Sequence, residues 1–339
     1  MGNKIEYVLT TGKDQTTNKA DSAAMTYELP PIRPPSEAHS LLIRVMRGCP
    51  WNYCTFCSVY KALPRKGMLR AVAEVKGDID AMRAEADALR ELGFRVEPRT
   101  AFLADSNAII VKTDDLVEII THLKESFPSL ERITSYGRAK TVLAKGLDDL
   151  TRLREAGLGR LHMGLESGDD ETLARVKKGA TAQEVIEAGR RAKAAGFELS
   201  VYIMPGLGGR ARSAEHARGT SAVLNAVDPH YVRVRPLHVI PGTPLYDEFL
   251  AGEFDAMSMG ETLAELRCTV AGLDISGNIC FDHMMNAPIF RQDWEGYKLP
   301  EAKEHLLALM DDTLESVRDV RSGESPRWLR EFPDRPVLL

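Results

Sequence analysis

The chain has 339 residues, of which 44% are hydrophobic and 27% are charged, and its formal net charge is −5. This composition is typical of a globular protein, and the absence of a basic block argues against a dedicated nucleic-acid binder. No apolar run reaches the roughly 18 residues that a membrane span needs. The polar start lacks the apolar core of a signal peptide, so we expect a cytoplasmic protein without a membrane span.

Strand and helix patterns alternate along most of the chain. Residues 1–40 predict an extended lead-in, because PPIRPP at 30–35 contains four prolines that disfavour a helix interior. Six β-rich apolar runs predict strands, at 41–47, 100–104, 132–135, 160–165, 198–204 and 231–237. Helical patterns lie between them, at 71–92, 114–127, 145–156, 182–195 and 213–226. Thr181 and Glu184 form a capping-box pattern that opens one of these helices.

This repetition predicts an α/β fold. Strands that alternate with helices indicate a parallel sheet, and six units indicate an open, partial (βα)6 barrel over residues 41–245. In such folds the chemistry lies at the carboxyl ends of the strands. Residues 246–339 predict a mainly helical C-terminal extension, with helices at 261–270 and 301–318. The irregular stretch 274–299 between these helices is a candidate substrate lid.

Three cysteines follow the first predicted strand directly. Cys49, Cys54 and Cys57 lie in RGCPWNYCTFC at 47–57, and three thiolates can bind three corners of one cubane iron–sulfur cluster. The fourth iron would then be free to bind a substrate. The alternatives are a zinc site that lacks one ligand, or three unrelated buried cysteines. Zinc would need four tight ligands, and no nearby Cys or His completes the set.

The cysteine loop and the six-unit pattern resemble the radical S-adenosylmethionine (SAM) superfamily. The usual gaps between the cysteines are three and two residues, whereas this chain has four and two. Phe56, directly before the last cysteine, matches an aromatic residue that is common there. GLESGDDETLARVKKG at 164–179 and VIPGTPLYDEF at 239–249 resemble the branch that includes oxygen-independent coproporphyrinogen oxidase and the Elongator catalytic subunit.

The resemblance implies the cofactors and the first chemical step. A [4Fe–4S] cluster held by the three cysteines would bind SAM at its free iron. One electron, from a partner such as flavodoxin or ferredoxin, would cleave SAM into methionine and a 5′-deoxyadenosyl radical. That radical would abstract a hydrogen atom from the substrate, while the protein orients and shields the reacting groups.

Residues at the strand ends are candidates for SAM contacts. Asp105 and Ser106 stand where the family has a Gly-Gly-Glu-like motif; they are expected either to accept from the SAM ammonium or to cap a helix. Glu166 is expected at the ribose, and Lys178 at the SAM carboxylate or in a solvated basic turn. Arg138 is expected at SAM or at the substrate. The full set of expected SAM contacts is Phe56, Asp105, Ser106, Arg138, Glu166, Ser167, Lys178, Met204 and Gly206.

The reaction itself is less constrained. We expect an enzyme that acts on a small molecule or lipid, with nucleic acid an unlikely partner; an RNA-modifying enzyme and a non-catalytic haem-chaperone-like relative are the alternatives. Cys280 and His283 in the lid stretch are candidate donors of a hydrogen atom or proton to a substrate radical, or they merely pack the extension. The methionines and Trp294 of that stretch favour a partly apolar substrate.

Overall fold

One sheet organises the molecule. The computed structural model describes residue 27 and residues 32–61, 68–291 and 295–318. Eight strands lie in the order β1-β4-β5-β6-β7-β8-β9-β10, and a separate pair joins β2 to β3. The sheet contains β1 (Leu41–Arg44), β4 (Thr100–Ala104), β5 (Arg132–Tyr136), β6 (Leu158–Glu166), β7 (Glu198–Ile203), β8 (Tyr231–Val234), β9 (Asn278–Cys280) and β10 (Tyr297–Lys298). The pair contains β2 (Met46–Arg47) and β3 (Met68–Leu69).

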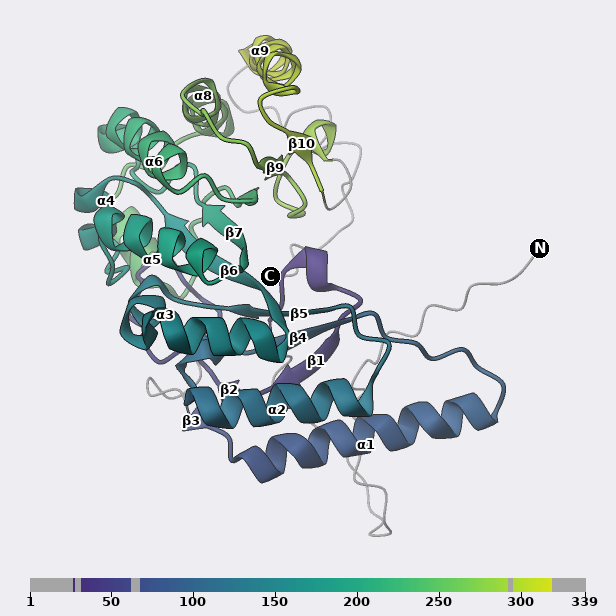
Figure 1. Ribbon diagram of the computed structural model, residues 1–339. Coiled ribbons are helices and arrows are strands. Elements are labelled where there is room, and N and C mark those ends of the chain that lie inside the picture. Colours follow the sequence, from purple (N-terminus) through teal and green to yellow (C-terminus); the bar gives the residue numbers. More distant parts are fainter. Residues whose placement is uncertain (1–26, 28–31, 62–67, 292–294, 319–339) are drawn as a thin grey trace, which may run out of the picture.

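Within the eight-stranded sheet every pairing from β1 to β9 is parallel, and β10 pairs antiparallel with β9. The carboxyl ends of seven strands therefore meet at one edge of the sheet. Figure 1 shows the sheet curving, with helices along its outer side and β9 and β10 at the opposite end from β1. This is the open, partial barrel that the sequence predicts.

The helices connect the strands and cover them. The α-helices are α1 (Val72–Glu91), α2 (Thr113–Ser126), α3 (Ala139–Ala156), α4 (Asp170–Arg175), α5 (Ala182–Ala194), α6 (Ser213–Val227), α7 (Pro244–Leu250), α8 (Met259–Ala271) and α9 (Lys303–Arg318). Four short 3₁₀ turns are η1 (Pro35–Glu37), η2 (Ala108–Ile110), η3 (Arg210–Arg212) and η4 (Pro288–Phe290). The capping box that opens α5 is present. The pattern at 145–156 captured only the part of α3 that follows a backbone break at Gly146.

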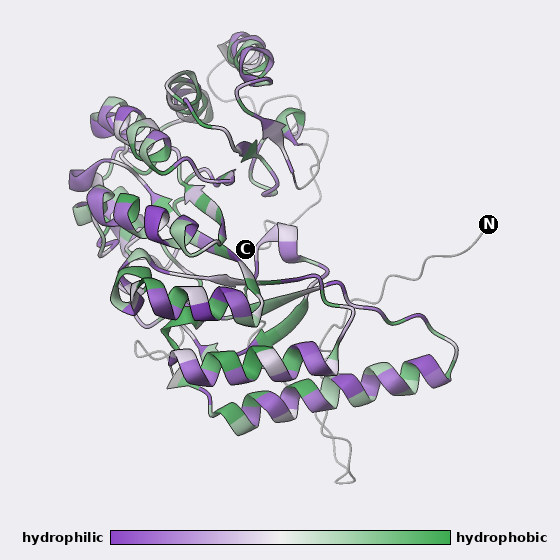
Figure 2. Cartoon of the chain, in the orientation of Figure 1, coloured by the Kyte–Doolittle hydropathy of each residue, from purple (hydrophilic) through white to green (hydrophobic). Residues whose placement is uncertain are grey.

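Alternation along the strands divides the sheet into two faces. One set, including Leu103, Ile133, Leu161, Leu199 and Val232, packs in the core formed with the helices. Figure 2 shows green, apolar stripes on the helices and on the strands that they cover. Burial of these apolar side chains against the helices stabilises one face of the sheet. The side chains at the alternate positions form the opposite face.

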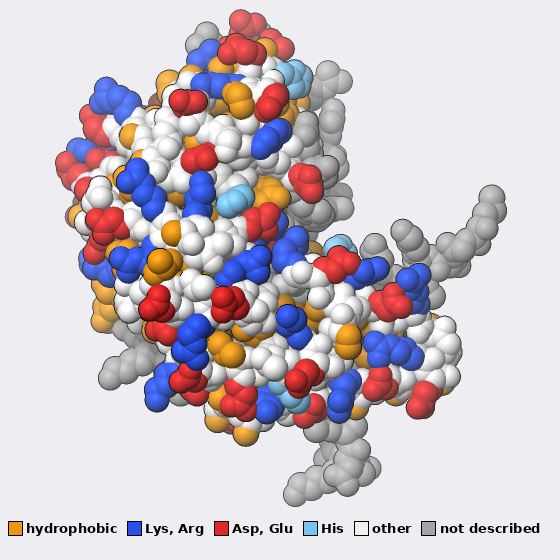
Figure 3. All heavy atoms as spheres, viewed as in Figure 1, with side chains coloured by type: hydrophobic (Ala, Val, Ile, Leu, Met, Phe, Trp, Pro, Cys, Tyr) orange, Lys and Arg blue, Asp and Glu red, His pale blue; other side chains and the backbone are white. Residues whose placement is uncertain are grey.

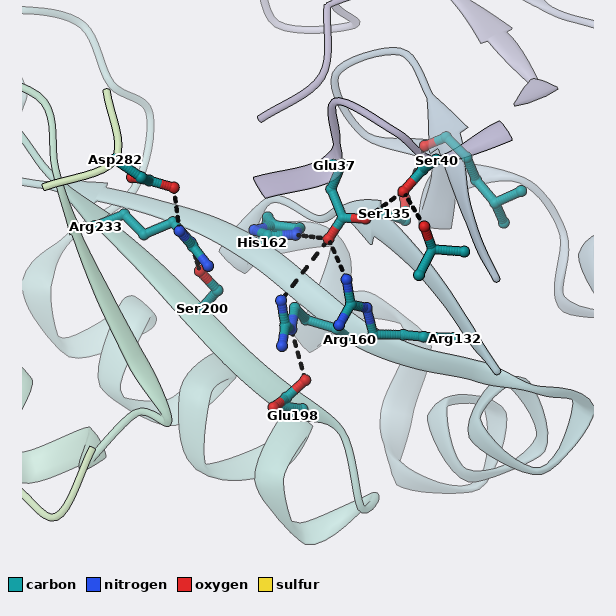
Figure 4. Close-up of polar contacts among 12 residues, drawn as sticks. Glu37, Ser40, Arg132, Ser135, Arg160, His162, Glu198, Ser200, Arg233 and Asp282 are labelled. Carbon is teal, nitrogen blue, oxygen red and sulfur yellow. Dashed lines mark hydrogen bonds and ion pairs between the residues drawn. The ribbon is translucent and has the colours of Figure 1, made fainter. Parts of the chain in front are cut away.

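The opposite face, which we call the lumen face, is aromatic and polar. Tyr136, His162 and Tyr202 lie within ring-contact distance of one another, with centroids 5.9 to 6.4 Å apart. Arg233 on β8 contacts Ser200 and pairs with Asp282, as Figure 4 shows. The lumen face therefore carries groups that can recognise a polar molecule.

Glu37 of η1 inserts into this face near the amino ends of the strands. It is fully buried, and Oε1 lies 3.4 Å from Nε2 of His162 and 3.5 Å from Nη2 of Arg132 (Figure 4). Burial alone would raise the pKa of Glu37, but hydrogen bonds and neighbouring cations lower it to about 2. The end of the expected lead-in is thus a packed part of the barrel.

The stretch 274–299 differs from the expected irregular lid. It supplies β9 and β10, so the extension completes the sheet. These strands are three and two residues long, too short for alternation to reveal them in the sequence. Trp294 lies outside the described residues. Across the part of the chain that the structure describes, none of the helices has both the length and the apolar character needed to cross a bilayer.

Candidate active site

Asp105 fastens the start of the cysteine loop. Its buried carboxylate pairs with Arg44 of β1 at 2.9 Å and accepts a hydrogen bond from the Gly48 amide at 2.8 Å. Ser106 donates to the Gly48 carbonyl oxygen at 2.9 Å. Through these contacts Asp105 and Ser106 hold the loop at the end of β1. Their expected contact with the SAM ammonium stays a prediction. No cap hydrogen bond from the side chain of Asn107 opens the following η2 turn.

The far side of the loop rests on the turn after α4. The Trp51 indole donates to the Lys177 carbonyl oxygen at 2.7 Å, and the guanidinium of Arg138 lies 4.9 Å from the Trp51 ring centroid. A side chain at Gly179 would lie 2.4 Å from the Trp51 ring, so this glycine permits the contact. Arg138 also donates to the Lys178 carbonyl oxygen at 3.1 Å. Arg138 therefore stabilises the position of the cysteine loop.

Cys49, Cys54 and Cys57 are free, half-buried thiols on this loop. Burial raises the pKa of Cys57 and raises that of Cys54 to about 11, and electrostatic interactions among the three thiols act in the same direction. Among the described residues, no three His, Cys, Asp or Glu side chains converge as ligands of a single metal ion. A cubane cluster requires a wider arrangement, because each thiolate binds a different iron. Three mutually interacting thiols on one loop fit that requirement.

Glu166 and Lys178 form an ion pair beside these cysteines. Lys178 Nζ lies 2.6 Å from Glu166 Oε1, and the side chains are 15% and 12% exposed. The Glu166 carboxylate raises the pKa of Lys178 despite burial, and the charge of Lys178 lowers the pKa of Cys54. A Cβ at Gly164 would lie 2.2 Å from Glu166 Oε1, so the missing side chain makes room for the pair. The pair therefore lies close enough to Cys54 to influence its thiol.

Ser167 is turned away from this pair. It is fully buried, and its hydroxyl lies 2.9 Å from Nδ1 of His216 on α6. Nε2 of His216 lies 3.5 Å from Glu265 of α8, and Glu265 accepts a hydrogen bond from the Gly206 amide at 2.7 Å. Burial raises the pKa of Glu265 to about 7. Through this chain the C-terminal extension holds the loops that follow β6 and β7.

No sequence pattern predicts a role for His216 or Glu265. Glu265 reads as an ordinary charge on an amphipathic helix, and its partner Gly206 lies 59 positions away. Met204, half-buried after β7, donates from its amide to the Glu166 carbonyl oxygen at 2.9 Å and so links two strand ends. Phe56 is half-buried on the cysteine loop. The expected SAM contacts of Phe56, Met204 and Gly206 stay predictions.

Cys280 and His283 lie at and beyond the end of β9. Cys280 is fully buried, and its thiol donates to the Glu295 carbonyl oxygen at 3.4 Å. His283 is half-buried and follows the strand end; because β9 runs parallel to β1, it lies at the same edge of the sheet as the cysteine loop. Their expected roles as donors of hydrogen or protons stay predictions. The burial of Cys280 favours the packing alternative for that residue.

The chain is similar in sequence to several curated proteins. A tRNA uridine(34) acetyltransferase from Methanocaldococcus infernus is 28% identical over 107 residues, or 31% of this chain and 20% of the relative. Human Elongator complex protein 3 is 24% identical over 213 residues, 62% of this chain and 38% of the relative. A 4′-phospho-dehydrooxetanocin synthase from Priestia megaterium is 24% identical over 317 residues, 87% of this chain and 38% of the relative. The chain thus spans a fifth to two fifths of the length of these curated relatives.

Among solved structures, coproporphyrinogen III oxidase (HemN) from Escherichia coli is similar with a TM-score of 0.49 and 18% identity, over 68% of this chain and 51% of that one. The expectation that nucleic acid is an unlikely partner finds no support, since the acetyltransferase relative carries tRNA in its name. The model of the radical SAM superfamily matches residues 43–217, which include the cysteine loop, Glu166 and Lys178. The chain therefore belongs to the radical SAM superfamily, as an enzyme whose cofactors are a [4Fe–4S] cluster and SAM.

Proposed function

We propose that Cys49, Cys54 and Cys57 hold the cluster and that the chain uses SAM to abstract a hydrogen atom from a substrate on the lumen face. The observation that carries this proposal is the placement of three free thiols beside the Glu166–Lys178 pair, at the carboxyl edge of the sheet. When bound, the cluster supplies the electron that cleaves SAM. The proposed compartment is the cytoplasm, where reducing conditions keep such thiols free.

The protein's own groups would orient SAM and fix the loop. Lys178 provides a cation for the SAM carboxylate, and Glu166 provides acceptor oxygens for the ribose hydroxyls. Gly206, with φ of +86°, has no side chain and lets the backbone approach the adenine. Asp105 keeps Gly48 and the adjacent Cys49 in place through the contacts described above. An electron donor such as flavodoxin or ferredoxin completes the proposed system.

We propose a small molecule as the substrate. The lumen face presents buried polar groups within the curve of the sheet, and the relative that matches 87% of this chain is named as a synthase of a phosphorylated compound. Figure 3 shows Lys and Arg interspersed with Asp and Glu over the visible face, rather than a basic patch that would attract a nucleic acid. The charged groups of the lumen favour a polar small molecule over a lipid.

An RNA nucleotide is the second candidate substrate. The observation that favours it is the similarity to a tRNA uridine(34) acetyltransferase, although the match covers 20% of that relative. A flipped-out nucleotide would place its base and phosphate on the same lumen face. The two candidate substrates therefore require different surfaces around the opening of the barrel, whereas both would use the same cysteine loop.

The test is anaerobic turnover with SAM and dithionite. The proposal predicts that 5′-deoxyadenosine forms. Its rate of formation should rise when either the small-molecule fraction of a cell extract or purified tRNA is added. Deuterium carried from a labelled substrate into 5′-deoxyadenosine identifies the fraction that contains the substrate. Stimulation by tRNA alone would select the second candidate, and the absence of 5′-deoxyadenosine under every condition would refute the proposed chemistry.

A further inference from the structure

Arg235 directly follows the end of β8, at the carboxyl edge of the sheet. Its amide donates to the Ile203 carbonyl oxygen at 3.0 Å, which continues the pairing of β8 with β7 beyond Val234. By strand alternation its side chain therefore lies on the same face as that of Arg233. Within the described part of the chain, the guanidinium of Arg235 makes neither a hydrogen bond nor an ion pair.

The loop that follows β9 packs over the end of β8, next to Arg235. Asp282 pairs with Arg233, and the Asn286 amide group donates to the Val234 carbonyl oxygen at 2.9 Å, which fixes the loop over the end of β8. Arg291 donates to the Asn286 carbonyl oxygen at 2.9 Å. His283 thus lies on a loop that is tied down on both sides, beside the free guanidinium.

The groups around Arg235 include two imidazoles, the guanidinium of Arg291, the phenols of Tyr136 and Tyr202, and the Asp282 carboxylate that pairs with Arg233. Burial and the charges of Arg235, His238 and Arg291 together lower the pKa of His283 to about 4. The pKa of His238 is lowered by burial and by Arg235. The guanidinium groups of Arg233 and Arg235 therefore share the carboxylate of Asp282, which pairs directly with Arg233, and this excess of positive charge is unfavourable unless an anion joins it.

The carboxylates of the lumen are already committed. Asp282 is paired with Arg233, Glu37 with Arg132 and Arg160, and Glu166 with Lys178. These partners come from separate strands and turns, so none of these carboxylates is free to neutralise Arg235. Among the described residues, the fold therefore leaves the positive charge of Arg235 without an ion-pair partner.

Below Arg235, the lumen face holds buried polar atoms for which the described residues provide no hydrogen-bond partner. They belong to side chains at most 6% exposed, on four neighbouring strands: Thr134 Oγ1, His162 Nδ1, Tyr202 OH and Arg233 Nη2. A buried polar group without a hydrogen-bond partner is destabilising, because it has lost its bonds to water. Four such atoms on one face indicate that a polar ligand, or water that the ligand displaces, satisfies them.

We propose that Arg235, with His238 and His283, binds an oxyanion of the substrate, a phosphate or carboxylate on a small molecule whose polar body lies against Thr134, His162, Tyr202 and Arg233. This inference rests on the proposed function, because it defines the substrate class of the same site. It replaces the expected partly apolar substrate with an anionic one. Arg235 supplies planar, paired donors that suit both oxyanions.

Binding of simple anions tests the inference without turnover. The full chain, reconstituted with its cluster and saturated with SAM, is titrated calorimetrically at pH 6 with inorganic pyrophosphate, with malonate and with purified tRNA. The first two probes distinguish phosphate from carboxylate. We expect one of them to bind, and Arg235→Gln to weaken it roughly tenfold to a hundredfold, the range for a hydrogen bond to a charged group.

Matched variants make the result specific. Arg218 is an exposed arginine on α6, and Arg218→Gln is expected to leave anion affinity unchanged. Arg235→Lys keeps the charge and is expected to retain most of the affinity, and His283→Gln provides a second lesion if Arg235→Gln fails to fold. Equal affinity in Arg235→Gln and Arg218→Gln, binding of neither small anion, or binding of tRNA alone would overturn the inference. SAM cleavage, measured separately, reports on the proposed function.

Discussion

Lys178 Nζ lies 2.6 Å from Glu166 Oε1, at the point where β6 ends beside the cysteine loop. Glu166 adopts a φ of +67°, which an L-residue rarely takes, and β6 shifts register between Gly164 and Glu166. These distortions direct the carboxylate to the lysine and toward Cys54, whose pKa both residues influence. The irregular backbone at the end of β6 thus positions Glu166 for its ion pair with Lys178.

Breaking this pair should weaken SAM binding. Glu166→Ala removes acceptors for the ribose and Lys178→Met removes a cation for the carboxylate, so each should lose roughly tenfold to a hundredfold in affinity, or about 1.5–3 kcal/mol. Equilibrium dialysis with SAM on the oxidised, cluster-loaded chain measures this. Each single variant leaves one charge buried and unpaired, so the double variant should lose less stability than the two singles combined. Unchanged SAM affinity in both single variants would remove the pair from the site.

Gly164→Ala should have a similar effect without touching either charge. The new Cβ would lie 2.2 Å from Glu166 Oε1 and 2.7 Å from Lys178 Nζ, both at the ends of flexible side chains. We expect the pair to move, SAM affinity to fall several-fold, and the unfolding free energy to change by only about 1 kcal/mol. Gly77→Ala, where nothing lies within 4 Å, is the control. A loss of folding rather than of affinity would contradict the local explanation.

The sequence predicted these residues for a physical reason. Strand alternation and loop glycines place Glu166 at a strand end, and parallel strands bring such ends to one edge, so the positions of Glu166 and the three cysteines follow from the sequence pattern. Lys178 was expected there from the family resemblance. The ion pair of Asp105 with Arg44 could not be predicted in this way, because it spans 61 positions and depends on the parallel pairing of β1 with β4. The same limit hid β9 and β10, which are stabilised by the sheet and not by local propensity.

Glu265 should make stability depend on pH. Its pKa is about 7 in the folded chain against an ordinary value of 4.5, because burial disfavours the charged form. A raised carboxyl pKa means that stability is greatest below pH 4.5, falls as the pH rises to about 7, and is flat above that. The expected loss from this group is on the order of 3 kcal/mol. Urea unfolding at constant iron content, between pH 5 and 8, measures it.

Glu265→Gln keeps an acceptor for the Gly206 amide and cannot ionise. The variant should therefore match the native chain near pH 5 and exceed its stability at pH 8. Glu91→Gln, at an exposed position on α1, controls for general charge effects. Parallel stability curves for the native chain and Glu265→Gln across this range would show that the carboxyl group does not titrate there.

Anion binding at Arg235 should take up protons. His283 has a pKa of about 4, lowered by burial and by Arg235, His238 and Arg291, and a bound anion would raise it. Affinity should therefore increase as the pH falls from 7 toward 5. Calorimetry at pH 5.5 in two buffers of different ionisation enthalpy measures the proton uptake. His283→Gln should reduce it, and an uptake equal to that of the native chain would assign the proton to another group.

The lumen residues lay beyond sequence reasoning. Tyr136, His162, Tyr202 and Arg233 occupy alternate positions in strands whose other residues are apolar, and the same pattern is common in strands with one solvated face. Only the curvature of the sheet and the insertion of Glu37 turn that face inward. Recognition by these side chains therefore becomes visible with the tertiary structure.

The central claim is that three cysteines hold a cluster with one iron open to SAM. The most direct measurement is the electron paramagnetic resonance spectrum of the reduced, reconstituted chain, with and without SAM, beside iron and sulfide analysis. We predict about four irons per chain and a spectrum that SAM changes. Alanine at Cys49, Cys54 or Cys57 should abolish the cluster, and Cys268→Ala, at an exposed thiol on α8, should leave it intact. A full cluster in all three variants, or a spectrum that saturating SAM leaves unaltered, would contradict the account.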